Sequence, residues 1–541
     1  MEGQMKEHRS STVRSENPVS LAESCVHRRF ETSVGYMGFG LALLLSLPSL
    51  YLFISTPPLW RDSDGFYQVA TKFEFLTVLH WPPLYCFCAR IPFLAATILD
   101  GSFFHTGFSF QWPRITDLGV YLLLVSQHLL LIGTLLSICL ILARSWLLRF
   151  LIAAFFVSCA PIYVFAHCVG SEAIMAPLLL LGCAAGIKYL SSPSRPWLIL
   201  LFCLIGLNIL DRHADAVIAG LVPLALLLLL AIALIRKPRV PRDRYYFRLT
   251  GRSLLVTIAV GIAGILAANG VVRAVCLIDK IPYRSRAGYA FVWRLDFLEN
   301  LPLPRQTAIL DRAESDLHDP AITVALEKVR EMSAKSEFAP DDACTAMDQA
   351  LGDEGYQGQA RHVMLDQKLN RFFSYVLWHD PVDLSRAVSH DVLNGMSFTP
   401  SLLTKDPFLC TDWLVKRIPE PRFHPIQNLR TLSTDSNAVQ QYDASPYFHF
   451  WSFLPFSAMA VGIVVAGLIG IFTAKNGRDL ALAVYAIACT LTGIASAVIS
   501  FTVVTLLPRL MLPTLILLCF AVVVLLLRLD PLRYDQSKPA A

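Results

Sequence analysis

Long apolar stretches separated by short polar segments dominate the chain. A helix that crosses the hydrocarbon core of a bilayer needs about 20 apolar residues, and ten stretches approach that length. They are residues 36–55, 119–143, 148–166, 170–190, 197–211, 214–235, 253–277, 449–473, 479–505 and 509–528. The fourth carries Glu172 near its start, and the fifth is short. This pattern predicts a mainly α-helical, polytopic membrane protein with about ten transmembrane helices.

Two longer polar segments interrupt the apolar pattern, and the first of them is 56–118. It is longer than a connector requires, and its residues 84–99 are apolar apart from interruptions such as Arg90 and Pro92. A stretch of that length suits a helix lying on the membrane surface better than one that crosses it. We therefore expect an interfacial helix within this first loop.

The second polar segment, 278–448, has the size of an independent soluble domain. Helices are expected over 321–335 and 357–378, where apolar residues recur at helical spacing. The motif His379-Asp380-Pro381 ends the second helix, because a proline disfavours the helical conformation in the residue before it. Residues 395–448 are rich in Pro, Asp, Thr and Ser, which predicts loops with few regular elements.

Composition and charge also predict how the chain is oriented in the membrane. Of the 541 residues, 55% are hydrophobic and only 16% are charged, whereas about a quarter of the residues in a soluble domain are charged. In a ten-helix arrangement the basic loops, most clearly 236–252, share one side with both termini, and the positive-inside rule assigns that side to the cytoplasm. The rule accounts for the net charge of +5 without a nucleic acid partner. The segment 278–448, with 18 Lys and Arg against 24 Asp and Glu, then faces the opposite side.

The first 35 residues are polar and include Arg28 and Arg29. A secretory signal peptide would place its apolar core nearer the start, so the first apolar stretch is expected to be an uncleaved anchor. The 13 cysteines include no CxxC pair. Cys344 and Cys410 both lie in the long polar segment, where a periplasmic location would permit a disulfide.

Two carboxylates, Asp62 and Asp64, follow the first apolar stretch. A carboxylate that faces a membrane-embedded cavity can accept a proton from a hydroxyl or help to hold a hard cation on a phosphate. Alternatively, the two acids simply terminate a transmembrane helix. The loop then reaches the motif His80-Trp81-Pro82-Pro83-Leu84-Tyr85, whose paired prolines either fix His80 and Tyr85 in a rigid turn or form a plain turn into the interfacial helix.

Two short turns on the same side carry further ionisable residues. His167 and Glu172 flank the turn before the fourth stretch, where a charge at the membrane edge is costly and usually functional. An acid at a helix N-terminus also simply favours the helix dipole. Arg212 and His213 belong to the turn Asp211-Arg212-His213-Ala214-Asp215, in which Arg212 either binds a phosphate or forms a surface ion pair of little energetic weight.

Arg509 begins the last apolar stretch on this side, against the inward bias of positive charge. It either binds an anionic, lipid-linked phosphate or extends to the lipid headgroups. The sequence contains no GxxxxGK[ST], HExxH or GxSxG motif. Nucleotide phosphates, a zinc protease centre and an α/β-hydrolase serine therefore have no support from these signatures.

Taken in order, these motifs resemble those of the GT-C superfamily of integral membrane glycosyltransferases. The closest branch contains the protein O-mannosyltransferases and the aminoarabinose transferases. That branch has an acidic motif and then a Pro-Pro-Leu-Tyr type motif in its first outer loop, which correspond here to residues 62–67 and 80–85. Glu172 is similar to its second outer-loop acid. Arg509-Leu510-Met511-Leu512-Pro513 is similar to its Arg-Tyr-x-x-Pro pattern, and Leu369 to Pro381 to a helix of its outer domains.

The resemblance covers the membrane half of the chain well and the segment 278–448 poorly. Ser63 stands where one form of the acidic motif has Glu, and Phe66 stands where many members have Tyr. Either Asp62 or Asp64 is therefore the candidate base. Asp62 is favoured because Asp62-Ser63 aligns with the Asp-Ser variants.

A GT-C-like fold with a periplasmic soluble domain is what the resemblance implies. The expected parts are a cytoplasmic tail 1–35, a transmembrane catalytic module 36–277 with its first outer loop 56–118, the periplasmic domain 278–448, transmembrane helices 449–528 and a cytoplasmic tail 529–541. The expected location is the bacterial inner membrane, with the active site on the periplasmic side.

The implied activity is transfer of a sugar, with inversion, from a polyprenyl phosphate or diphosphate donor to a hydroxyl of a glycan, lipid or protein acceptor. The catalytic candidates are Asp62, Asp64 and Glu172. The substrate-binding candidates are His80, Tyr85, His167, Arg212, His213 and Arg509. A divalent cation, Mg²⁺ or Mn²⁺, held by Asp62 and Glu172 is an open alternative to arginine for stabilising the leaving phosphate.

Two other functions stay open. A transporter or flippase of a lipid-linked sugar would use the same charges for binding without chemistry. A structural subunit of an assembly that makes an envelope polysaccharide would need no catalytic residues in the outer cavity.

Overall fold

A computed structural model describes most of the chain. The described residues are 18–61, 83–101, 115–235, 241–278, 287–335, 340–418, 429–432, 437–504 and 507–530. For a few of them, including residues 18–34 and 241–250 and His213, only the backbone is described. Asp62, Asp64 and His80 lie outside the described residues.

Helices form nearly all of the described structure, and seven are long and apolar enough to cross a membrane. Their apolar parts are Gly35–Ser55, Asp117–Leu142, Glu172–Ser191, Ala214–Ile235, Gly251–Leu277, Gly477–Val503 and Pro508–Leu529. They belong to α1 (Pro18–Ser55), α5 (Asp117–Leu142), α8 (Glu172–Ser191), η2 (His213–Gly220) with α10 (Leu221–Ile235), α11 (Pro241–Ile278), α21 (Gly477–Val503), and η7 (Pro508–Met511), α22 (Leu512–Leu526) and η8 (Leu527–Leu529). The chain is a mainly α-helical, multi-pass membrane protein.

The other predicted spans also form helices, but these helices are shorter. Residues 148–166 form α6 (Trp146–Ser158) and α7 (Ala160–Ala166), which meet at an angle of 67°. Pro161 lies in the first turn of α7 and has no N–H to continue the ladder of α6. The helices α9 (Arg195–Asp211) and α20 (Phe456–Phe472) have 17 residues each. Seven spans, or eight with the bent pair, are therefore supported, and the predicted count of ten is not confirmed.

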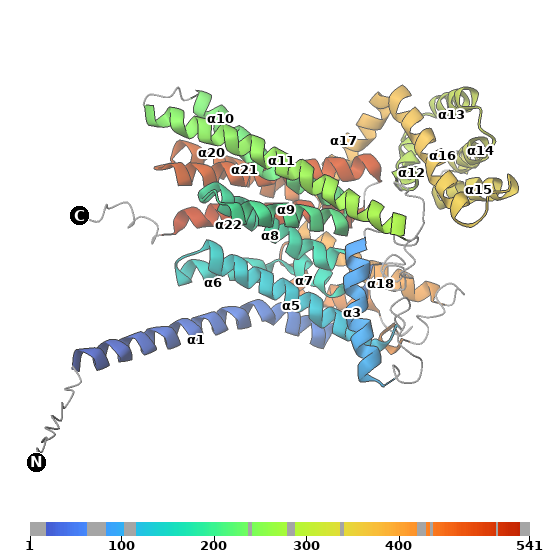
Figure 1. Cartoon of the computed structure of the whole chain (residues 1–541). Coiled ribbons are helices and arrows are strands. Elements are labelled where there is room, and N and C mark those ends of the chain that lie inside the picture. Colours follow the sequence, from blue (N-terminus) through green and yellow to red (C-terminus); the bar gives the residue numbers. More distant parts are fainter. Residues whose placement is uncertain are drawn as a thin grey trace, which may run out of the picture.

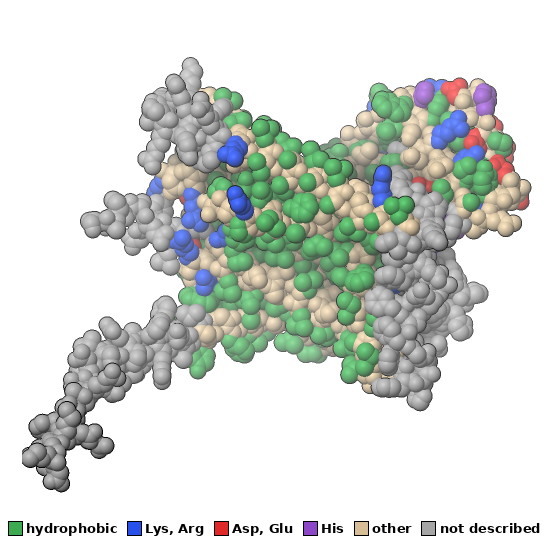
Figure 2. Space-filling view, in the orientation of Figure 1, with side chains coloured by type: hydrophobic (Ala, Val, Ile, Leu, Met, Phe, Trp, Pro, Cys, Tyr) green, Lys and Arg blue, Asp and Glu red, His purple; other side chains and the backbone are tan. Residues whose placement is uncertain are grey.

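The spanning helices differ in how far they are buried. The last span, Pro508–Leu529, is 83% buried inside the protein, whereas the first, Gly35–Ser55, is 28% buried. The central helix α22 packs against α8, α20 and α21, and α1 lies at the edge of the bundle (Figure 1). The start of α1 and the end of α22 lie at the same end of the bundle. Figure 2 shows Lys and Arg side chains near this end and an apolar belt beyond them.

The helix α3 (Pro83–Leu99) runs across the opposite end of the bundle rather than along it (Figure 1). Its bounds confirm the helix predicted over 84–99, and Pro92 lies inside it. It packs on α5 and α9, and the side chain of Arg90 in its centre is buried. Its Tyr85 hydroxyl accepts from the Gly170 N–H, so the helix borders the turn that precedes α8.

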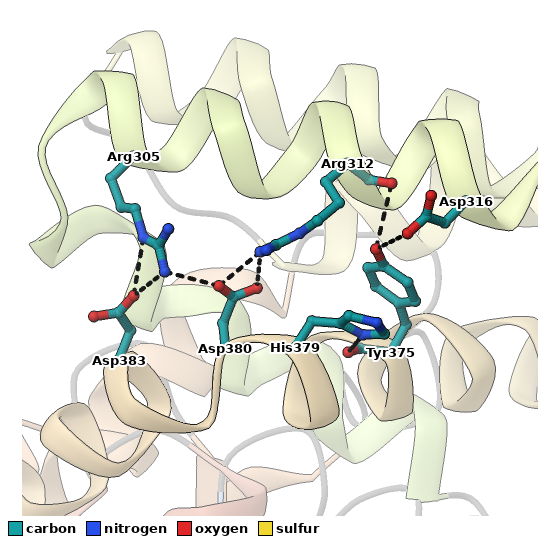
Figure 3. A network of polar contacts seen from close by, with 7 residues as sticks. All are labelled: Arg305, Arg312, Asp316, Tyr375, His379, Asp380 and Asp383. Atoms are coloured by element: carbon teal, nitrogen blue, oxygen red, sulfur yellow. Dashed lines mark hydrogen bonds and ion pairs between the residues drawn. The ribbon is translucent and has the colours of Figure 1, made fainter.

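A helical module with its own core lies beyond this end of the bundle (Figure 1). It consists of α12 (Ala287–Val292), η3 (Trp293–Asn300), α13 (Leu303–Leu317), α14 (Pro320–Lys335), α15 (Pro340–Asp353), α16 (Gly358–His379) and α17 (Pro381–Ser397). The helices predicted over 321–335 and 357–378 are confirmed, and α16 ends at His379 before Pro381 as expected. Asp380, between α16 and α17, binds two arginines of α13 (Figure 3).

The expectation of loops over 395–448 is wrong for its first part. Residues Pro400–Arg417 form the helix α18, followed by α19 (Ala438–Ala444) and η6 (Pro446–His449). Pro407 is a breaker by local preference, but the packing of α18 on α7 and β1 (Leu59–Trp60) outweighs that preference. Leu403 and Phe408 are fully buried in the core of the membrane bundle, not in the core of the module.

The two cysteines considered for a disulfide are not bonded to each other. Cys344 is buried in the core of the helical module, whereas Cys410 is on α18. Because the two residues belong to different parts of the fold, the bridge that the sequence left open is not formed.

Candidate active site

The segment that leaves α1 lies against the turn between α7 and α8. Leu59–Trp60 pairs in parallel with β2 (Cys168–Val169), and the Arg61 N–H donates to the Val169 carbonyl at 3.1 Å. The Trp60 N–H donates to the Thr411 hydroxyl of α18 at 2.8 Å. This small sheet therefore fixes Arg61, the last described residue before Asp62, beside the first turn of α8.

Glu172, the first residue of α8, lies at the centre of the site. Its side chain is only 2% exposed, and its Oε1 atom is 3.1 Å from Arg61 Nε and 3.5 Å from Arg212 Nη1. The charge of Arg509 also acts on this carboxylate. A buried carboxylate is stable only when it is paired and hydrogen-bonded, and here three arginines from separate segments supply the positive charge.

Gly170 lets Arg61 lie close to this carboxylate. A Cβ atom at position 170 would be 2.9 Å from Arg61 Cβ and 3.1 Å from Glu172 Oε2. Both distances are too short for an ordinary contact, so any larger residue would displace one of the two partners. In the sequence Gly170-Ser171-Glu172, close packing therefore requires the glycine, whereas the glutamate is the residue with candidate chemistry.

Two polar side chains hold the turn in shape. The Gln127 amide of α5 donates to the carbonyls of Ala166 and Cys168, at 2.9 and 3.1 Å. Tyr85 of α3 accepts from the Gly170 N–H at 2.8 Å and donates to Gln127 Oε1 at 3.1 Å. The Tyr85 hydroxyl is thus used in both directions within the protein. Its predicted contact with a substrate stays a prediction.

A chain of buried hydrogen bonds continues from the turn toward α1. His167 Nε2 lies 3.2 Å from the Thr56 carbonyl, His167 Nδ1 lies 3.1 Å from His128 Nε2, and His128 Nδ1 lies 2.9 Å from the Ser49 hydroxyl. A carbonyl only accepts, so His167 carries its proton on Nε2, His128 also carries its proton on Nε2, and Ser49 donates to His128. Burial lowers the pKa of His167 to about 4, which keeps this ring neutral.

The described candidate residues meet at one end of the bundle. Tyr85 and His167 hold the turn, and Glu172 lies between Arg61 and Arg212, within the electrostatic reach of Arg509. The structure describes only the backbone of His213, at the start of η2. The catalytic roles of Asp62, Asp64 and Glu172, and the substrate contacts of the other candidates, stay predictions.

The sequence reasoning did not single out Arg61, Gln127 or His128. Arg61 directly precedes the acidic motif, so its position was visible. Gln127 and His128 are adjacent polar residues within an otherwise apolar span, and such residues in membranes usually have a specific role. That signal would have identified both of them.

Metal binding by the predicted pair has no geometric support yet. Within the described ranges, no group of three or more His, Cys, Asp or Glu side chains has the arrangement needed for a metal ion. Glu172 is engaged by arginines, and Asp62 is not described. A cation held by Asp62 and Glu172 therefore remains a prediction.

Comparison with known proteins adds no family to these observations. No family model matches the chain, and neither the curated proteins nor the solved structures contain a match to it.

Proposed function

We propose that this protein is a membrane glycosyltransferase of the GT-C type, which transfers a sugar from a polyprenyl-phosphate or polyprenyl-diphosphate donor to an acceptor hydroxyl. The observation that carries this proposal is the arginine-rich environment of Glu172. Arg61 and Arg212 contact a single oxygen of this buried carboxylate, and Arg509 acts on it as well. The site lies at the end of the bundle that α3 crosses (Figure 1), where Tyr85 of α3 binds the turn before Glu172.

The arginines suit the leaving group of this reaction. When the bond between the anomeric carbon and the phosphate oxygen breaks, the electron pair goes to the lipid phosphate, which leaves as an anion. Arginine is permanently charged and matches phosphate geometry, and fixed positive charge at a leaving group lowers the barrier. Arg212 and Arg509 are the proposed phosphate ligands, with Glu172 holding Arg61 and Arg212 in place.

Asp62 is the proposed base. Its carboxylate takes the proton of the acceptor hydroxyl, and the hydroxyl oxygen then forms a bond to the anomeric carbon with inversion. Asp62 follows Arg61 in the chain, and Arg61 is 3.1 Å from Glu172. This proximity in sequence supports a base close to the arginines.

The proposed orientation places the site on the periplasmic side and both termini in the cytoplasm of a bacterial inner membrane. Basic side chains lie near the end of the bundle where α1 begins, and the helical module lies beyond the opposite end (Figure 2). The positive-inside rule favours this arrangement.

A transporter or flippase of the same lipid-linked sugar is the second candidate. The observation that favours it is the 67° break between α6 and α7, because broken helices are common at the binding sites of transporters. A transporter would move the donor across the membrane and leave the bond between sugar and phosphate intact.

The test uses the full-length protein in proteoliposomes that contain polyprenyl-phosphate sugars labelled in the sugar. A transferase releases polyprenyl phosphate and labels an acceptor in an added envelope extract, and the Asp62→Asn variant does neither. Full transfer by a stably inserted Asp62→Asn variant would contradict the proposed base. Movement of intact donor without cleavage would support the transporter.

A further inference from the structure

A second group of buried oxygen atoms lies next to the arginine-rich site and has no role in the proposed transfer. Asn208, Asp211 and Asp215 are each 0% exposed. Within the described structure, the Asn208 Oδ1 atom and all four carboxylate oxygens of the two aspartates lack a hydrogen-bond partner. Leaving such groups buried and unsatisfied is unfavourable, most of all for charged groups, so a ligand that binds them would remove a penalty.

The backbone brings these three residues together. Asn208 and Asp211 are three residues apart on α9 and therefore share one face of the helix. Asp215 follows in η2, which packs directly on the end of α9. Among charged neighbours, Asp215 has the largest electrostatic effect on Asp211.

The Asn208 amide is oriented by its own hydrogen bond. Its NH₂ group donates to the Leu204 carbonyl at 2.8 Å, and this carbonyl cannot donate in return. The Oδ1 atom must therefore face away from Leu204. It is the neutral oxygen of a set that otherwise contains two carboxylates.

The neighbouring arginine does not satisfy these acids. Arg212 lies between them in the chain, but its Nη1 atom faces Glu172 Oε1 at 3.5 Å and Met175 Sδ at 3.7 Å. The charge of Arg212 acts on both aspartates and that of Arg61 on Asp211, but no described donor binds the carboxylate oxygens themselves.

We infer that Asn208, Asp211 and Asp215 form a binding site for a hard divalent cation of the Mg²⁺ and Mn²⁺ class. These ions prefer oxygen ligands, and Mg²⁺ usually binds one or two carboxylates and keeps several waters. A charge of +2 balances the two aspartates. The site differs from the pair Asp62 and Glu172 that the sequence suggests, and it does not depend on the proposed transfer.

The experiment measures Mn²⁺ binding by electron paramagnetic resonance. Purified full-length protein is stripped with EDTA and placed in nanodiscs of zwitterionic lipid, which do not themselves concentrate cations. We expect about one bound Mn²⁺ per chain, displaced by excess Mg²⁺. This measurement contains no donor or acceptor, so its result does not depend on sugar transfer. A protein that binds Mn²⁺ here but transfers no sugar in the proteoliposome assay refutes only the proposed function.

Four variants locate the ion. Asp211→Asn and Asp215→Asn are expected to weaken Mn²⁺ binding at least tenfold, and Asn208→Asp is expected to tighten it because a carboxylate replaces a carboxamide. Asp443→Asn, which changes an acid whose side chain is 58% exposed, is the matched control and should bind as the wild type does.

Two results overturn the inference. One is a wild-type protein with no more bound Mn²⁺ than empty nanodiscs. The other is unchanged binding in folded Asp211→Asn and Asp215→Asn variants. If those variants do not fold, Asn208→Asp decides: an affinity equal to or below that of the wild type places the ion elsewhere.

Discussion

Two buried carboxylates in this protein each contact two arginines, and the contacts differ. In the helical module, Asp380 Oδ1 lies 2.9 Å from Arg305 and 2.7 Å from Arg312, and Oδ2 also binds Arg312 (Figure 3). Both oxygens are satisfied, and the arginine side chains are 47% and 38% exposed. This arrangement is a fixed connection between α13 and the junction of α16 and α17.

The contacts of Glu172 are longer and its arginines are more buried. Arg61 and Arg212 are both directed at one oxygen, at 3.1 and 3.5 Å, and their side chains are only 12% and 10% exposed. Both arginines are thus directed at a single carboxylate oxygen inside the protein, at the place where the phosphate of the donor is proposed to bind. The comparison teaches that the same residue types form a structural clamp in one region and a candidate binding site in the other.

The largest difference between the two regions is expected when the carboxylate of each is neutralised. Glu172→Gln leaves Arg61 and Arg212 buried without their partner, a change that costs about 3–5 kcal/mol in a buried pair. We expect donor-dependent sugar transfer to fall about 100-fold or more. The measurement is transfer in proteoliposomes, with equal amounts of protein that remains monodisperse on size exclusion.

The control for this prediction is Asp380→Asn, which should destabilise the module and leave transfer unchanged. Equal losses of transfer in both variants would show that the two carboxylates have the same role. Full transfer by Glu172→Gln would remove Glu172 from the site.

The next largest effect concerns pH and the histidine chain. Burial lowers the pKa of His167 to about 4, whereas an exposed histidine has a pKa of about 6.5. The unfolded state therefore binds more protons between these values, so the stability that the neutral ring contributes is present above pH 6.5 and is lost as the pH falls to 4. The loss is about 3 kcal/mol.

Thermal unfolding of the wild type and of His167→Asn, followed from pH 7 to pH 4, checks this prediction. The variant lacks the titrating ring. The slope of its free energy of unfolding against pH should therefore correspond to the uptake of about one proton fewer. Parallel pH profiles of the two proteins would refute a neutral His167.

A smaller effect is expected at Gly170. The Gly170→Ala variant places a Cβ atom 2.9 Å from Arg61 Cβ, so the strand or the arginine must shift. Overpacking of this kind costs about 1–3 kcal/mol, and we expect a lower melting temperature and weaker transfer. Gly133→Ala is the matched control, because its Cβ would meet nothing within 4 Å. A helical alanine there should be neutral or stabilising, and equal melting temperatures for the two variants would contradict the close packing.

The smallest effect is expected in the module. Arg305→Ala removes a side chain that is 47% exposed, and Arg312 continues to bind both oxygens of Asp380. The stability of the module should change by less than about 1 kcal/mol, with no change in transfer. Limited proteolysis of the module against urea concentration measures this, and a loss of several kcal/mol would show that Arg305 is essential to the clamp.

Local sequence patterns predicted many of the helices and few of the contacts. The helix over 357–378 and its end at Pro381 followed from spacing and from proline chemistry, and both are observed. The helix α18 was missed because Pro407 and its polar neighbours favour loops locally, while its burial against the bundle favours a helix. Arg61 and Gln127 were missed because their partners are distant in the sequence. The partners of Gln127 are about 40 residues away, and Glu172 is more than 100 residues from Arg61.

The sequence by itself determined that the chain enters a membrane and where most of its helices run, because long apolar segments leave water and satisfy their own backbone hydrogen bonds as helices. Only the tertiary structure decided which polar residues meet. Ion pairs such as Arg61 with Glu172, and the unsatisfied group of Asn208, Asp211 and Asp215, depend on the packing of separate helix ends. Distances of a few ångströms set their energies, and spacing along a chain does not fix such distances.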